Sequence, residues 1–128
     1  MRRALLLAAA LILSPVIAIA DPSNDYILHC RGCHGPEGAG VPGNVPSLRG
    51  QMGRFLRVEG GREFLVQVPG AAQSELNNAR LAALLNWMLI QFSPDETAAG
   101  FQHSTEDEIA RLRHPLADVE SVRRRLVQ

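Results

Sequence analysis

The chain has 128 residues, of which 46% are hydrophobic and 20% charged, and these values fit one globular domain and exclude a multidomain enzyme. Its 13 basic residues are all arginine and balance 13 acidic ones, so the chain has no excess positive charge to attract nucleic acid. The two cysteines, Cys30 and Cys33, are too few for a disulfide scaffold, and their close spacing favours a reactive or cofactor-holding pair.

The chain begins with a predicted Sec-type signal peptide, residues 1–20. Two arginines after the first residue precede an apolar run that is broken only around Pro15, and Ala18 and Ala20 suit signal peptidase. An uncleaved membrane anchor is the alternative, but the run is short for a span and contains a proline. We therefore expect an exported, periplasmic protein whose mature chain starts at Asp21, with contact to the membrane only if the segment stays uncleaved.

The start of the mature chain predicts a short helix followed by a long loop. Residues 25–29 form the helix, which runs into Cys30, and Ser23 or Asn24 is the expected N-cap. The stretch 35–53 is so rich in glycine and proline that neither helical nor strand periodicity survives. A loop of this length in a compact domain is usually functional, and this one begins beside the cysteines.

Two helical regions are predicted next. Residues 54–68 indicate two short helices joined at Gly60-Gly61, with a strand over 63–68 as the alternative. A longer helix ends at Phe92 and carries a wide apolar stripe, which indicates burial on more than one side. The candidate N-caps of this helix are Ser74 and Asn77.

Residues 94–128 are more charged and predict a tail of two helices. Thr105 and Glu108 form a capping box before the first, and Pro115 separates it from the second. The run 123–125 is three arginines; we favour solvated cations at a helix end over an anionic binding surface. The predicted organisation is a signal peptide over 1–20, a domain over 21–93 and a C-terminal helical tail over 94–128.

The strongest chemical signal is Cys30-Arg31-Gly32-Cys33-His34, the Cys-x-x-Cys-His pattern of covalent haem attachment. One helical turn between the cysteines lets both sulfurs reach the two vinyl groups of haem, and the adjacent histidine can hold the iron. We therefore predict one covalently bound haem c, attached through Cys30 and Cys33 and ligated by His34.

Three other interpretations of the cysteines stand beside haem attachment. A zinc site would need a fourth ligand, and His29, His103 and His114 are the only imidazole candidates. A thioredoxin-like dithiol would need a βαβ pattern, which the sequence lacks. A short structural disulfide with an incidental histidine remains open, because export permits it.

The sequence resembles the class I cytochrome c family over Asp25 to Phe92. The resemblance rests on the attachment motif continued by Gly35 and on three further features: Gly38-Ala39-Gly40, Pro46-Ser47-Leu48, and the closing helix with Trp87. It implies an all-α fold around one haem, with Trp87 as the aromatic partner where the first and last helices cross at a glycine–aromatic contact. It also implies that the Pro46 carbonyl accepts the second ring N–H of His34 and that Leu48 packs on the haem ring.

The sixth iron ligand departs from the family pattern. The resemblance places a methionine in the segment 68–73, and none occurs there. Met88 lies on the apolar stripe and is expected in the core, whereas Met52, flanked by glycines, is a candidate ligand. Water, a histidine or no sixth ligand are the alternatives. His29 is expected to point away from the iron, and His103 and His114 are expected at the surface.

The favoured function is electron transfer through the haem, with no enzymatic activity and with redox proteins as partners: a dehydrogenase, an oxidase or another cytochrome. The missing methionine motivates the alternative, a haem enzyme or gas sensor with an open coordination position. A third hypothesis is an exported binding module without haem, held by a Cys30–Cys33 disulfide.

Overall fold

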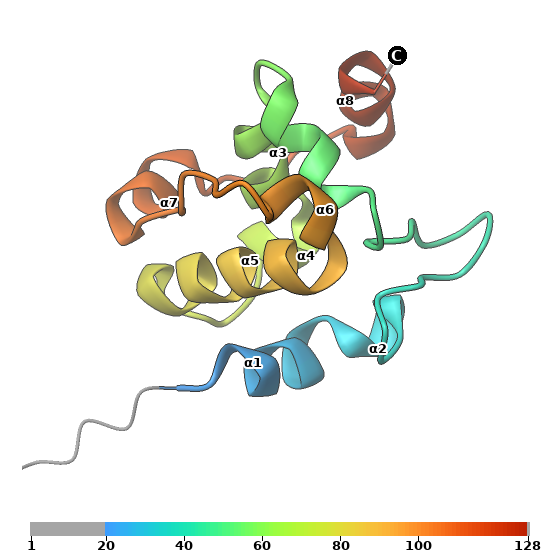
Figure 1. Ribbon diagram of the computed structural model, residues 1–128. Helices are drawn as coiled ribbons and strands as arrows, with labels where there is room; N and C mark the ends of the chain where they lie inside the picture. Colours follow the sequence, from blue (N-terminus) through green and yellow to red (C-terminus); the bar gives the residue numbers. More distant parts are fainter. Residues whose placement is uncertain (1–19, 128) are drawn as a thin grey trace, which may run out of the picture.

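The structure is a computed structural model that describes residues 20–127, and within them it contains helices and no strand (Figure 1). An isolated antiparallel bridge joins Val41 and Val45 in the long loop. The predicted all-α fold is therefore confirmed. The helices are α1 (Pro22–His29), α2 (Arg31–His34), the 3-10 helix η1 (Met52–Arg57), α3 (Gly61–Gln67), α4 (Pro69–Ala72), α5 (Asn78–Phe92), α6 (Pro94–Thr97), α7 (Glu106–Leu112) and α8 (Val119–Leu126).

Helices α1 and α5 cross at an aromatic contact. The rings of Tyr26 and Trp87 lie 5.6 Å apart, which confirms Trp87 as the partner in this crossing. The expected glycine is absent, since α1 contains none, and the contact joins two aromatic rings instead. The buried carboxylate of Asp25 beside it pairs with the guanidinium of Arg80, so a charged contact adds to the apolar one.

The helix caps only partly match the predictions. Asp21, not Ser23 or Asn24, caps α1, because its carboxylate accepts the Ser23 backbone N–H at 2.9 Å. Asn77 caps α5 and Thr105 caps α7, as predicted. The Glu108 carboxylate of the predicted capping box is held mainly by the Arg62 guanidinium, at 2.7 and 2.9 Å, and a hydrogen bond from the Thr105 backbone adds to this contact.

A glycine pair separates η1 from α3, as the sequence predicts, and the alternative strand over 63–68 is wrong. Gly60 has φ +78°, in the left-handed region that favours glycine. At Gly61 a Cβ would collide with the Phe55 carbonyl oxygen, so only glycine allows this approach of the two helices. The turn therefore brings Phe55 and Phe64 together, with ring centroids 4.7 Å apart.

The long loop between α2 and η1 is pinned to the helices. The backbone N–H of Gly50 donates to the Phe92 carbonyl, and that of Leu48 donates to the Gly38 carbonyl at 2.8 Å. Gly38, at φ +70°, also packs against Phe92, since a Cβ there would lie 2.8 Å from the ring. These contacts give the loop a defined path along one side of the domain.

The C-terminal region packs onto the core. It contains the short helix α6 in addition to the two predicted helices. Helix α7 lies against α5 and α3 and buries Ile109 completely. The tail therefore contributes to the same core as the preceding helices.

The predicted signal peptide falls on residues 1–20, of which 1–19 lie outside the described residues, so it stays a prediction. Within residues 20–127, none of the helices has the length and apolar character required to cross a membrane.

Candidate cofactor site

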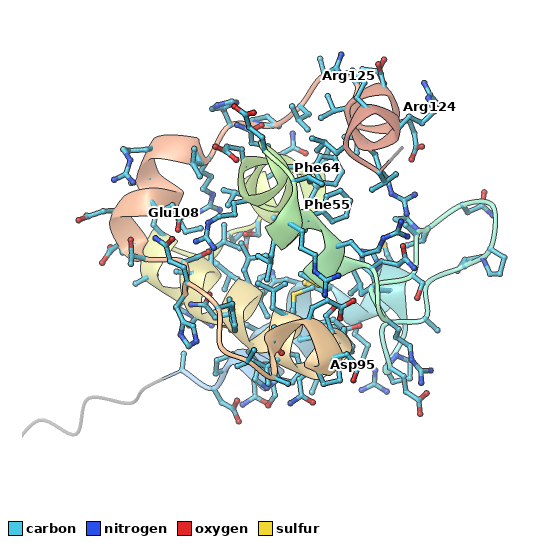
Figure 2. The ribbon with its side chains drawn as sticks, turned by 45° about the horizontal axis from the view of Figure 1, so that its top comes forward. Phe55, Phe64, Asp95, Glu108, Arg124 and Arg125 are labelled. Atoms are coloured by element: carbon cyan, nitrogen blue, oxygen red, sulfur yellow. The ribbon has the colours of Figure 1, made fainter. Side chains whose placement is uncertain are left out.

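A cavity of about 500 Å³ lies among α2, the long loop, η1, α3, α4, α5 and α8, and its lining is mostly apolar. Its volume falls in the usual range for small-molecule and cofactor sites. Phe55 and Phe64 contribute two of its aromatic side chains, and Figure 2 shows them close together between η1 and α3. Leu48 also lines the cavity, where the resemblance predicted a side chain in contact with a haem ring.

Cys30, Cys33 and His34 all line this cavity. One helical turn connects them, because the backbone N–H groups of Cys33 and His34 both donate to the Cys30 carbonyl, at 3.2 and 3.0 Å. Cys30 and Cys33 are not joined by a disulfide. Burial raises the pKa of the Cys30 thiol to about 11, with the nearby Asp25 carboxylate as a second cause, so this thiol is protonated at neutral pH.

The His34 ring is oriented by the loop. Its Nδ1 donates to the Pro46 carbonyl oxygen over 3.1 Å, as the resemblance implied. Gly40 allows this arrangement, because a Cβ there would lie 2.7 Å from the same oxygen. Burial lowers the pKa of His34, partly opposed by the Pro46 hydrogen bond, and so favours the neutral imidazole that binds metals through Nε2.

The two methionine candidates also reach the cavity, and both are buried. Met88 lies in the core on α5, as predicted. Met52 was predicted in the long loop over 35–53, flanked by glycines, but it begins η1. Gly53 provides close packing there instead of flexibility, because its N–H donates to Ser93 Oγ at 2.9 Å and a Cβ would collide with Glu96.

The three histidines other than His34 lie in different surroundings. His29 was expected to point away from the iron, and it is one of the residues that line the cavity. His103 is exposed and packs on the Phe101 ring at 4.6 Å. The exposed His114 contacts the Gln67 side-chain amide at 2.9 Å, so the surface positions predicted for His103 and His114 are confirmed.

The alternative of a zinc site finds no support in residues 20–127, where no three His, Cys, Asp or Glu side chains gather to hold a metal ion.

The sequence did not reveal that α8 covers part of the cavity. Val119, Glu120 and Arg123 all line it, and Arg123 is the arginine among the lining residues. Arg123 follows Val119 by four positions and Glu120 by three, which places it on the same side of the helix as both, but only the tertiary structure shows what that side faces.

The structure is a small all-α domain with an apolar cavity of cofactor size, and Cys30, Cys33 and the oriented imidazole of His34 lie at the cavity wall. No family model matches the chain. Over 126 residues it is 30% identical to a cytochrome c-552 of Thermus thermophilus, with 84% of each chain covered. Over 112 residues it is also 30% identical to a second Thermus thermophilus cytochrome c-552, covering 73% of this chain and 85% of the relative. The chain belongs to the c-type cytochrome family.

Proposed function

We propose that this protein is an exported monohaem electron carrier of the class I type, with haem c bound through Cys30, Cys33 and His34. The observation that carries the proposal is the convergence of these three side chains on one apolar cavity of suitable volume. The named relatives, both cytochromes c-552, support a haem-based redox function.

Each cysteine would hold the haem by adding its S–H across a vinyl group, which forms one C–S and one C–H bond without net oxidation. His34 would bind the iron through Nε2, and its hydrogen bond to Pro46 would keep the ring in place during a change of oxidation state. Haem supplies the one-electron redox chemistry, and the apolar lining sets its potential through burial.

The lining of the cavity contains a cation that suits the two carboxylates of haem. Arg123 lines both this cavity and an adjoining groove formed with residues 42–47 of the loop, and the Glu120 carboxylate lines both as well. An anionic group at this place would gain a charge-assisted contact from the guanidinium. The exposed Cys33 lies on another part of the lining, where a redox partner protein could approach the cofactor edge.

The test is intact-mass and peptide mapping of the protein purified from the periplasm. We expect a mature chain that begins at Asp21 and carries one haem on Cys30 and Cys33, and a reversible one-electron titration. His34→Ala should lose most of its haem. A purified protein without covalent haem, or a His34→Ala variant with unchanged haem content and spectrum, would contradict the proposal.

A further inference from the structure

The hydroxyl of Tyr26 extends from the crossing of α1 and α5 to the end of α2. The ring itself is 2% exposed and packs against the rings of Trp87 and Phe92, whose centroids lie 5.6 and 5.1 Å away. The Oη atom donates to the Gly35 carbonyl oxygen at 2.6 Å. The packing requires only an aromatic ring, so the hydrogen bond of the hydroxyl is a separate feature of this side chain.

The acceptor of this hydrogen bond belongs to the turn by which the chain leaves His34. Gly35 follows His34 directly and caps α2, where the chain passes into the long loop (Figure 1). Gly35 and Gly38 have φ +76° and +70°, and the Gly38 backbone N–H donates to the Gly35 carbonyl at 3.3 Å. A turn with two glycines has many accessible backbone conformations, so a side-chain donor restrains it.

The turn is joined in its own right to the segment that orients the His34 ring. The Gly38 carbonyl accepts the Leu48 backbone N–H at 2.8 Å and the Ser47 hydroxyl at 3.4 Å. Pro46 directly precedes Ser47, and its carbonyl oxygen accepts the Nδ1–H of His34 over 3.1 Å. A series of short contacts therefore leads from the hydroxyl on α1 to the imidazole.

The position of the Pro46 carbonyl depends on such neighbouring contacts. Pro46 is exposed and lies in a part of the loop without regular structure. A proline has no backbone N–H, so it cannot be anchored by a hydrogen bond that it donates itself. Its carbonyl is therefore held through the residues that follow it, Ser47 and Leu48, and through the glycine turn to which these two residues are bonded.

The protonation of Tyr26 suits a donor. Burial raises the pKa of its hydroxyl above the ordinary 10.0, the Cys30 thiol acts in the same direction, and a hydrogen bond from the Gly38 backbone opposes them in part. A tyrosinate could not donate to the Gly35 carbonyl. The hydroxyl therefore keeps this contact at neutral and mildly alkaline pH.

We propose that Tyr26 is a positioning residue for the iron ligand: its hydroxyl fixes the turn 35–38 and, through this turn, the Pro46 carbonyl that orients the His34 imidazole. The inference rests on the proposed function, in which His34 binds the haem iron. It gives Tyr26 a role beyond its packing at the crossing of α1 and α5. A fixed acceptor at Nδ1 keeps the imidazole in one tautomer and one orientation.

The test is Tyr26→Phe, which keeps the ring and removes the hydroxyl alone. The readout is the Nδ1–H of His34 in the reduced, ¹⁵N-labelled holoprotein, followed by NMR. We expect hydrogen exchange of this proton to be about fivefold faster than in the wild type, because one hydrogen bond of ordinary strength changes an opening equilibrium by about this factor. The proton resonance should also move upfield, since its hydrogen bond to Pro46 becomes longer.

Thr105→Ala is the control for a general loss of stability. It removes the N-cap of α7, which is worth about as much as one hydrogen bond, and it lies outside the series of contacts. It should leave the exchange and the resonance of the His34 Nδ1–H at their wild-type values.

Ser47→Ala provides a second test that leaves the aromatic crossing untouched. It removes the hydroxyl that donates to the Gly38 carbonyl, and it should also speed the exchange of the His34 Nδ1–H. In the double variant with Tyr26→Phe, the acceleration should be smaller than the product of the two single effects, because both changes act on the same turn.

Wild-type exchange and resonance position in Tyr26→Phe would overturn the inference while leaving haem attachment intact. An equal acceleration in Thr105→Ala would also overturn it, since general destabilisation would then account for the effect. Accelerations that multiply in the double variant would show that Tyr26 acts independently of the glycine turn. A purified wild type without covalent haem would instead refute the proposed function itself.

Discussion

Replacing Arg113 with methionine should destabilise the whole domain, because this side chain joins the tail to the connection between α4 and α5. Arg113 follows the end of α7, and its guanidinium donates to backbone carbonyl oxygens of Ala72, Ser74 and Leu76. It also donates to the Asn78 side-chain oxygen at 3.1 Å. The Arg113 guanidinium thus supplies hydrogen-bond donors to several oxygen atoms of the segment that connects α4 to α5.

The size of the effect follows from these acceptors. A hydrogen bond contributes about 1 kcal/mol net, and more when one partner is charged, but exposed acceptors recover part of this from water. We therefore expect Arg113→Met to lower the free energy of unfolding by about 3 kcal/mol. At about 4–8 °C per kcal/mol for a domain of this size, the melting temperature should fall by roughly 12–24 °C.

The assay is urea and thermal unfolding of the holoprotein, followed by helical circular dichroism. Arg111→Met is the matched control: it removes the same charge from an exposed position on α7 and should change stability by less than about 0.5 kcal/mol. Equal stability losses in the two variants would refute the reasoning, since they would show that loss of a tail cation, and not of these contacts, governs the effect.

Two further predictions concern charges on the tail. Contact with the Arg62 guanidinium lowers the pKa of Glu108 below its ordinary 4.5, so this pair stabilises the fold above that pH and its contribution disappears as acid protonates the carboxylate. The free energy of unfolding, measured over a pH series, should therefore fall less below pH 4.5 in Arg62→Gln than in the wild type. The same pH profile in both proteins would contradict a stabilising Arg62–Glu108 pair. If Arg123 faces the haem carboxylates, Arg123→Gln should lower the reduction potential, because the lost positive charge favours the reduced haem. For one partly screened charge, we expect the ferric–ferrous equilibrium to shift about fourfold toward the ferric form. Arg124, which points outward in Figure 2, is the control, and an equal shift in Arg124→Gln would refute a specific role for Arg123.

Much of the candidate site could be predicted from local sequence. The spacing of Cys30, Cys33 and His34 predicts their shared location, because one helical turn links them whatever surrounds it. The glycine and proline content predicts the long loop, and the apolar stripe predicts α5. Family resemblance added the contact between His34 and Pro46, which depends on a loop path that composition alone does not specify.

Contacts between distant segments were decided only by the tertiary structure. The local sequence predicts the capping-box role of Glu108, whereas its contact with the Arg62 guanidinium depends on how α3 packs against α7. Likewise, the sequence presents Met52 beside glycines, but whether Gly53 bends freely or packs tightly depends on α6. Arg123 is one of three consecutive arginines, and only the position of α8 separates it from its neighbours. The physical reason is the same in each case: spacing along one helix determines which residues share a side, whereas the crossing of helices determines what that side meets.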